Sequence, residues 1–238
     1  LHSFPTRRSS DLDLTSGVLS NVKLFADDTS LYLIIEDPIQ TQTLLNDDLQ
    51  QISQWATKWQ VKFSPEKTEA MLFTNKTFSS PKLPLTFNNT VISEVNEHKH
   101  LGLIFQNDGK WQNHINYMLR KASPLINCLR SLKYRLNRLS LETMYRSFIL
   151  PIFDYCDTIW DNCTLEQANM LEKLHLDALR TISGAVRGTS HEKLYSDTGF
   201  SSLAERRQCH KLSICFIKWL MGLRHDTSLC GYPLVYPM

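Results

Sequence analysis

The hydrophobic pattern of this chain changes once, after the turn signal Asn107-Asp108-Gly109, and that change limits the possible folds. Before the turn, short apolar runs rich in β-forming residues alternate with turn residues, with one helical stretch among them. After it, apolar residues recur every three or four positions, the spacing of amphipathic helices. We therefore predict an α+β fold, with an antiparallel sheet and a packed helix over residues 13–107 and an all-helical unit over residues 108–238.

The first unit is predicted to begin with a hairpin followed by a helix. Val22–Phe25 and Thr29–Ile35 are apolar runs separated by a short polar turn, as in two antiparallel strands. Asp37 can cap a helix with Pro38 at its first position, and apolar residues recur at helical spacing over residues 45–59. Further strands are predicted at Glu69–Thr74, Leu85–Phe87, Thr90–Ile92 and His100–Phe105.

The second unit is predicted to be built from helices. Apolar spacing predicts a helix over residues 115–132, which Pro124 should kink or split because proline lacks the N–H that a helix needs. Ser140 can cap a helix that runs to Leu150 and ends at Pro151. Capping signals predict two more helices, one from the Thr164–Gln167 capping box to Gly184 and one over residues 202–223.

Charge is distributed unevenly along the chain, although the formal net charge is only +2. Residues 13–50 hold seven acidic side chains against Lys23 alone, a net charge of −6, whereas residues 110–150 hold eight cations against Glu142 alone, a net charge of +7. A solvated helix face usually mixes both signs, so we favour nucleic acid binding for the basic stretch. The candidate contacts are Arg120, Lys121, Arg130, Lys133, Arg135 and Arg138.

The opening segment and the hydropathy of the chain bear on its location. Leu1–Leu12 resembles read-through from a sequencing adaptor and is excluded from the fold prediction. No apolar run is long enough to cross a membrane, and the chain does not begin like a signal peptide. We therefore expect an intracellular protein, in the cytoplasm or the nucleus, with no membrane partner.

Histidine and cysteine residues do not predict a metal site. The spacing of His98, His100 and His114 follows no closed set of ligands. His210 lies between Cys209 and Cys215, but neighbouring residues on one helix point in different directions, so we expect these side chains to serve packing instead.

Asp27 and Asp28 are the strongest candidates for catalytic chemistry, because they lie at the tip of a predicted hairpin. An isolated pair of aspartates is more often an ordinary turn, in which the side chains bond to local backbone. Nucleotidyl transfer, however, needs hard oxygen ligands for two magnesium ions, and a rigid hairpin would hold such ligands in place. The surrounding motifs decide between the two interpretations.

Phe25–Thr29 resembles the palm hairpin of reverse transcriptases, and the downstream order resembles non-LTR, jockey-like retrotransposon enzymes. Trp55 and Trp59, followed by Phe63–Thr68 and Met71–Phe73, are similar to the family's W…W…F-N-P-x-K-T…M-x-F stretch, with serine in place of the usual asparagine. The resemblance implies that Lys67 helps to protonate the leaving pyrophosphate as a general acid, although a lone surface lysine is usually only solvated.

The resemblance continues over nearly the whole chain after residue 13. His98–Leu103 is similar to the family's primer-grip hairpin, which would bring Leu101 and Gly102 to nucleic acid. Residues 145–160 are similar to the thumb signature Y-x2-F-I-x-P-x-L-D-Y-x4-W, and segments 171–184 and 203–207 continue the match. Most of these aromatic positions are expected to serve packing, so their order identifies the family better than their chemistry does.

The resemblance implies a partial polymerase palm followed by a helical thumb. The parent enzyme would use two Mg²⁺ ions, held by Asp27 and Asp28, to copy an RNA template onto a DNA primer from deoxynucleoside triphosphates. The family's other metal-binding aspartate, its nucleotide-selecting segment and its fingers lie upstream of the matched region, so we predict that this polypeptide is inactive alone. A catalytically silent nucleic-acid-binding remnant is the alternative, and a plain helical interaction domain would leave the hairpin motif unexplained.

Overall fold

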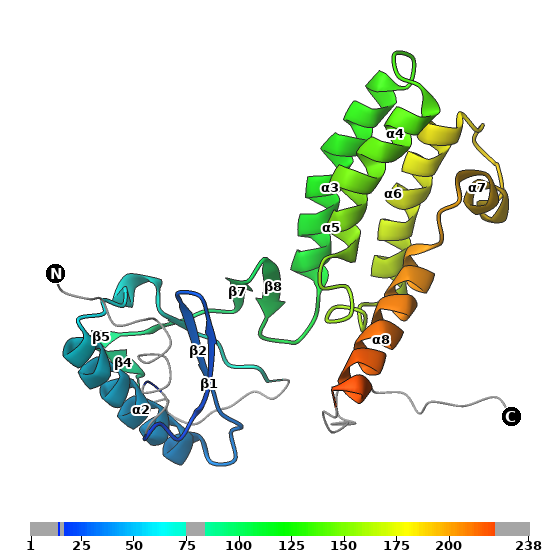
Figure 1. Ribbon diagram of the computed structural model, residues 1–238. Helices are drawn as coiled ribbons and strands as arrows, with labels where there is room; N and C mark the ends of the chain where they lie inside the picture. The colour runs from blue at the N-terminus through cyan, green and yellow to red at the C-terminus, as the bar shows by residue number, and fades with distance from the viewer. Residues whose placement is uncertain (1–13, 15–16, 75–83, 222–238) are drawn as a thin grey trace, which may run out of the picture. The chain divides into compact units, whose positions relative to one another are not determined.

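The computed structural model describes Leu14 and residues 17–74 and 84–221, so the predicted adaptor segment lies outside the described residues. The chain divides into two compact units. One comprises the residues up to His98 together with Gln106–Gly109, and the other comprises Lys99–Phe105 and the chain from Lys110 onward. Strands and one long helix make up the first unit and helices dominate the second, which confirms the predicted α+β class (Figure 1).

Among its described residues, the first unit contains one long helix and three small strand pairs. Its helices are α2 (Pro38–Trp59) and the 3-10 turn η1 (Pro65–Lys67). Its strands are β1 (Asn21–Phe25), β2 (Asp28–Tyr32), β3 (Glu69–Ala70), β4 (Thr86–Phe87), β5 (Thr90–Val91) and β6 (Ser93–Glu94). The pairs β1–β2 and β4–β5 are antiparallel, whereas β3 pairs with β6 in parallel. The predicted strand over Glu69–Thr74 was therefore too long.

Helix α2 is the scaffold of the first unit. Asp37 caps it by accepting hydrogen bonds from the backbone of Ile39 and Gln40, as the sequence predicted. Its buried face packs Leu49 and Ile52 against apolar residues of the chain around β4 and β5, including Phe87 and Ile92. Asn46 adds a polar anchor, because its amide oxygen accepts from the Thr86 backbone at 2.9 Å. The helix thus holds the β4–β5 hairpin through both apolar and polar contacts.

A further hairpin, of β7 (Glu97–His100) and β8 (Leu103–Gln106), lies where the chain passes from one unit to the other. Apolar pattern alone had predicted one strand over His100–Phe105, and that prediction was wrong. Leu101 and Gly102 both have positive φ, +46° and +85°, so the chain reverses between them and two strands result. The resemblance to a hairpin-forming segment of reverse transcriptases had indicated this turn correctly.

Helix α3 (Gln112–Leu132) passes through Pro124 without interruption, so the predicted split at this proline was wrong. Pro124 lies on the exposed side of the helix, while the buried face is formed by residues such as Ile115, Ala122 and Ile126. Proline leaves one backbone carbonyl of the preceding turn without its helical partner. On the exposed side that carbonyl is open to solvent, so it need not stay without a hydrogen bond, and the packed face holds the helix together.

The prediction for the next helix was wrong at both ends. The cap is Asn137 and not Ser140, because the Asn137 side chain accepts from the Ser140 backbone at 2.9 Å. Helix α4 (Arg138–Met144) leads into a π-helical turn, η2 (Tyr145–Ile149), and then into α5 (Leu150–Asp154). The helical path therefore continues past Pro151. The π turn ends directly before α5, and a proline in the first turn of a helix needs no partner for an N–H group.

Three helices complete the second unit. They are α6 (Leu165–Ser183), α7 (His191–Thr198), which the sequence did not predict, and α8 (Leu203–Leu220). The capping box of Thr164 and Gln167 and the ending at Gly184 are confirmed for α6. Helix α8 begins as predicted after Ser202, which forms its own capping box with Glu205, but ends at Leu220; residue 223 lies outside the described part.

The core of the second unit lies where α6 packs against α3 and α4. Trp160, Tyr145 and Phe153 are its largest fully buried side chains, and Leu171 and Leu179 of α6 are also fully buried. Within the described residues, no helix combines the length and the apolarity needed to cross a membrane.

His175 is a fully buried polar residue in this core. Its Nε2 lies 3.1 Å from the carbonyl oxygen of Ser201, which can only accept, so Nε2 carries the proton. Its Nδ1 therefore accepts a hydrogen bond from the Tyr145 hydroxyl. Burial lowers the pKa of His175 to about 4 and raises the pKa of Tyr145 well above its usual value. Both groups are neutral at pH 7.

This buried histidine should make stability depend on pH. Between pH 6.5 and 4 the unfolded chain binds a proton at His175 that the folded chain does not, so the free energy of unfolding falls as pH falls. The loss should reach about 3 kcal/mol at pH 4 relative to pH 7. Urea unfolding of the wild type and of His175→Gln, followed by circular dichroism, should show a stability difference that shrinks by this amount on acidification. The same substitution at the exposed His191 is the control, and an equal difference at both pH values would contradict the assignment.

Candidate nucleic-acid interface and metal-binding hairpin

Asp27 and Asp28 lie at the tip of the β1–β2 hairpin. Phe25 pairs with Asp28, so Ala26 and Asp27 form a two-residue turn. Ala26 has a φ of +54° and Asp27 does not have positive φ, which is the sign pattern of a type II′ turn. Both aspartates are exposed, Asp27 in the turn and Asp28 at the first position of β2. Two hard oxygen ligands of this kind suit a magnesium ion.

The hairpin is anchored at its base by a buried carboxylate of α2. Asp48 is 1% exposed and accepts hydrogen bonds from the backbone N–H of Leu19 at 2.9 Å and of Ser20 at 2.7 Å. The Ser20 hydroxyl donates to the same carboxylate. These bonds fix the chain directly before β1. In the sequence, Asp48 stood out only as one of the acidic residues of segment 13–50. A buried acid at a helical position otherwise occupied by apolar residues was the signal that could have identified it.

Removal of the Asp48 carboxylate should loosen the entry to the hairpin. Asp48→Ala leaves the buried backbone N–H of Ser20 and the partly buried N–H of Leu19 without an acceptor, so we expect the first unit to lose about 2–4 kcal/mol of stability. Amide hydrogen exchange at Leu19 and Ser20, measured with the melting curve of the whole chain, reports this loss. Asp47→Ala removes the exposed neighbouring acid and should change stability by less than about 0.5 kcal/mol. Equal effects of the two substitutions would show that Asp48 is not an anchor.

Lys67 ends the 3-10 turn η1 and is exposed. Its backbone N–H donates to the Ser64 carbonyl at 3.1 Å, which ties this turn together. Among the described residues, no hydrogen bond or ion pair connects the Lys67 ammonium to Asp27 or Asp28. A role for Lys67 as a general acid is therefore a prediction that rests on the motif alone.

The turn of Leu101 and Gly102 is at the surface of the second unit, and Leu101 is 39% exposed. Gly102 has no room for a side chain, because a Cβ atom there would lie 3.2 Å from a ring carbon of Tyr155. The glycine is thus explained by its φ of +85° and by the tyrosine ring.

The cations predicted to bind nucleic acid divide into two groups. Arg138 is engaged in structure, since its guanidinium pairs with Glu142 at 2.9 Å and with Asp197 of α7 at 3.2 Å. Arg130 lies 3.6 Å from Asp177, a long and half-exposed pair. The other four make no ion pair with an acid in the described part of the chain; they are Arg120, Lys121, Lys133 and Arg135.

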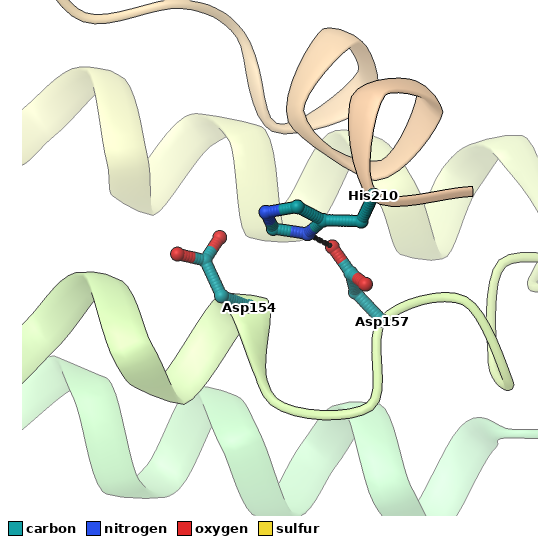
Figure 2. Close-up of side chains that lie close together, drawn as sticks. All are labelled: Asp154, Asp157 and His210. Atoms are coloured by element: carbon teal, nitrogen blue, oxygen red, sulfur yellow. Dashed lines mark hydrogen bonds and ion pairs between the residues drawn. The ribbon is translucent and has the colours of Figure 1, made fainter. Parts of the chain in front are cut away.

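A cluster that the sequence did not predict lies between the end of α5 and helix α8. Asp154, Asp157 and His210 have potential ligand atoms within 4.8 Å of one another, and no other group of three such residues occurs in the described part (Figure 2). His210 Nδ1 lies 2.6 Å from a carboxylate oxygen of Asp157. Asp154 already receives two hydrogen bonds from Arg206, at 2.9 and 2.6 Å. A guanidinium in this position neutralises the carboxylate and opposes a cation, so the cluster is an ion-pair network.

The network continues along α8 and fixes this helix to the unit. Arg207 donates to Asp161 at 2.9 Å, and Lys211 pairs with the other oxygen of the same carboxylate. Arg206 and Arg207 belong to segment 203–207 of the family resemblance, which did not predict their partners. Their partners lie about fifty positions earlier in the chain, so spacing could not reveal them.

The chain is similar to RNA-directed DNA polymerases of non-LTR retrotransposons, which confirms the resemblance stated from its motifs. No protein-family model matches this sequence, and no solved structure matches it.

Among individual proteins, the chain is 25% identical over 167 residues to the RNA-directed DNA polymerase from mobile element jockey of Drosophila funebris, a match that covers 69% of this chain and 18% of that protein. The jockey polymerase of Drosophila melanogaster is 26% identical over the same shares of both chains. A Pol polyprotein from the type-1 retrotransposable element R1 4 of Nasonia vitripennis is 28% identical over 56% of this chain and 33% of its own length. The chain thus spans about a fifth of the jockey proteins and a third of the R1 polyprotein.

Proposed function

We propose that this chain is the part of a non-LTR retrotransposon reverse transcriptase that holds the primed template, with the first unit as part of the palm and the second unit as the thumb. The observation that carries the proposal is the set of thumb cations without an acidic partner in the described residues, which are the exposed Arg120, Lys121 and Arg135 and the partly buried Lys133. Cations that are not already neutralised remain available for phosphate groups. Similarity to RNA-directed DNA polymerases supports an RNA template and a DNA primer as the nucleic acids.

The parent reaction would be RNA-templated DNA synthesis. Asp27 and Asp28 would hold Mg²⁺, which supplies charge neutralisation for the triphosphate when it is bound. Lys67 would donate a proton to the leaving pyrophosphate. Carboxylates at the tip of an anchored hairpin suit the first role, and an exposed ammonium in the matched motif suits the second.

We further propose that the 238-residue polypeptide binds nucleic acid without polymerising. Asp27 and Asp28 are not joined by a third ligand residue in the described part of the chain, and two neighbouring carboxylates do not enclose two metal ions. The same observation favours the alternative of a catalytically silent, nucleic-acid-binding remnant. In both cases the thumb cations would be responsible for the nucleic-acid binding that remains.

Binding of a primed RNA template should depend on the unpaired thumb cations. The double variant Lys121→Gln/Arg135→Gln should bind more weakly, and the slope of log affinity against log salt should fall in magnitude by about 2, since each lost phosphate contact removes about 0.9. Arg187→Gln/Lys193→Gln is the matched control, because it removes the same charge from exposed cations elsewhere in the unit. Equal salt slopes for both double variants would rule out a specific role for Lys121 and Arg135. No binding by the wild type would refute the proposed function.

Primer extension tests the catalytic part of the proposal. With Mg²⁺, deoxynucleoside triphosphates and a primed RNA template, the 238-residue chain should add no nucleotide. Asp27→Asn/Asp28→Asn should leave the affinity for the primed template within about twofold, because the binding energy comes from the thumb. Extension that disappears in the Asp27→Asn/Asp28→Asn variant would show instead that this polypeptide is itself a polymerase.

A further inference from the structure

The turn of Leu101 and Gly102 has a backbone conformation that requires outside support. Both residues have positive φ, which joins β7 and β8 with the sign pattern of a type I′ turn. Glycine adopts such angles freely, but leucine does so rarely because its Cβ crowds the following carbonyl. A leucine held in this conformation at the surface indicates that its surroundings determine the geometry of the turn.

Tyr155 supplies that support from the segment after α5. Its hydroxyl donates a hydrogen bond to the carbonyl oxygen of Leu101 at 2.5 Å. Its ring lies directly against Gly102, where a Cβ atom would be 3.2 Å from Cε1 and 3.5 Å from the hydroxyl oxygen. One side chain therefore contacts both residues of the turn and fixes the direction in which the turn points.

Tyr155 is itself held by the core of the second unit. Its backbone N–H donates to the carbonyl of Pro151 at 3.1 Å, and its own carbonyl accepts from the indole N–H of Trp160 at 3.1 Å. Trp160 is completely buried. Tyr155 thus connects the Leu101–Gly102 turn to the buried core of the helical unit.

Two more contacts attach the hairpin beside this turn. The Lys99 ammonium donates to the Tyr117 hydroxyl at 3.4 Å and lies 4.7 Å from the centre of its ring. The Ile104 backbone donates to Nδ1 of the buried His114 at 3.4 Å. Tyr117 and Lys121 lie four residues apart on α3 and therefore on one face, so the hairpin is fixed beside an unpaired cation.

We propose that Tyr155 is a positioning residue that holds the Leu101–Gly102 turn for contact with the sugar-phosphate backbone of the primed template. The inference rests on the proposed nucleic-acid-binding function and adds a residue to it. Tyr155 is half exposed and its ring faces the turn and not the core, so its contacts serve the turn more than the packing of the unit.

The test compares Tyr155→Phe with the wild type in the full chain. The variant keeps the ring against Gly102 but loses the hydrogen bond to Leu101. We expect the Kd for a primed RNA template to rise about fivefold, the effect of one lost hydrogen bond. The salt slope should not change, because no cation is removed, and the melting temperature should stay within about 2 °C, because the hydroxyl is at the surface. Amide exchange of residues 99–105 should accelerate while that of α3 does not.

Two further variants make the assignment specific. Gly102→Ala places a methyl group against the Tyr155 ring and should also weaken binding, and its combination with Tyr155→Phe should be less than additive because both act through one contact. Tyr134→Phe removes a hydroxyl from a tyrosine that is 86% exposed and should bind like the wild type.

The outcomes separate the two proposals. If the wild type binds with a salt slope that Lys121→Gln/Arg135→Gln reduces, but Tyr155→Phe has an unchanged Kd, the positioning role is wrong and the proposed function stands. Weaker binding without faster exchange of residues 99–105 also overturns the positioning role. If the wild type does not bind, both proposals fail.

Discussion

The ion pairs between helix α8 and the segment Asp154–Asp161 hold the second unit together. Asp154 is the last residue of α5, and residues 155–161 after it form turns without helix or strand, so this part of the chain needs side-chain contacts to keep its path. Arg206 and Arg207 supply them through Asp154 and Asp161, in a partly buried position where charge-assisted bonds are stronger than on an open surface. The same segment contributes Trp160 to the core and Tyr155 to the β7–β8 turn. Helix α8, the core of the second unit and the β7–β8 turn are therefore all attached to this one segment.

Local signals predicted the helices well because they act over a few residues. Asp37, the Thr164–Gln167 box and Gly184 each end or begin a helix through bonds to the nearest turn, and all three stand as predicted. The prolines were interpreted wrongly because their effect depends on surroundings. Pro124 lies on an exposed face and leaves its helix intact, whereas a π turn carries the chain past Pro151.

The location of the aspartate pair could be predicted from the sequence, since two strand-like runs around a short turn leave few alternatives. Which cations form ion pairs with acids could not be predicted from the sequence. Arg138 and Arg135 look alike in the sequence, yet Arg138 binds Asp197, which lies 59 positions away, and Arg135 has no acidic partner in the described residues. Asp48 was missed for the same reason, because its three donors come from a segment 28 or 29 positions earlier. Contacts between distant residues depend on the completed fold.

The π turn η2 also sets a limit on how this segment can vary in length. In this turn the backbone of Leu150 donates to Tyr145, one residue further back than in an α-helix. Because this turn already holds one residue more than an α-helical turn, the loss of one residue from it can be absorbed by a return to α-helical spacing. The loss of one residue from the α-helical turns on either side would instead rotate everything after it by about 100° around the helix axis, and Asp154 would then face away from Arg206. Related chains that keep this ion pair are therefore expected to tolerate a gap of one residue within Tyr145–Ile149 but not elsewhere between Arg138 and Asp154.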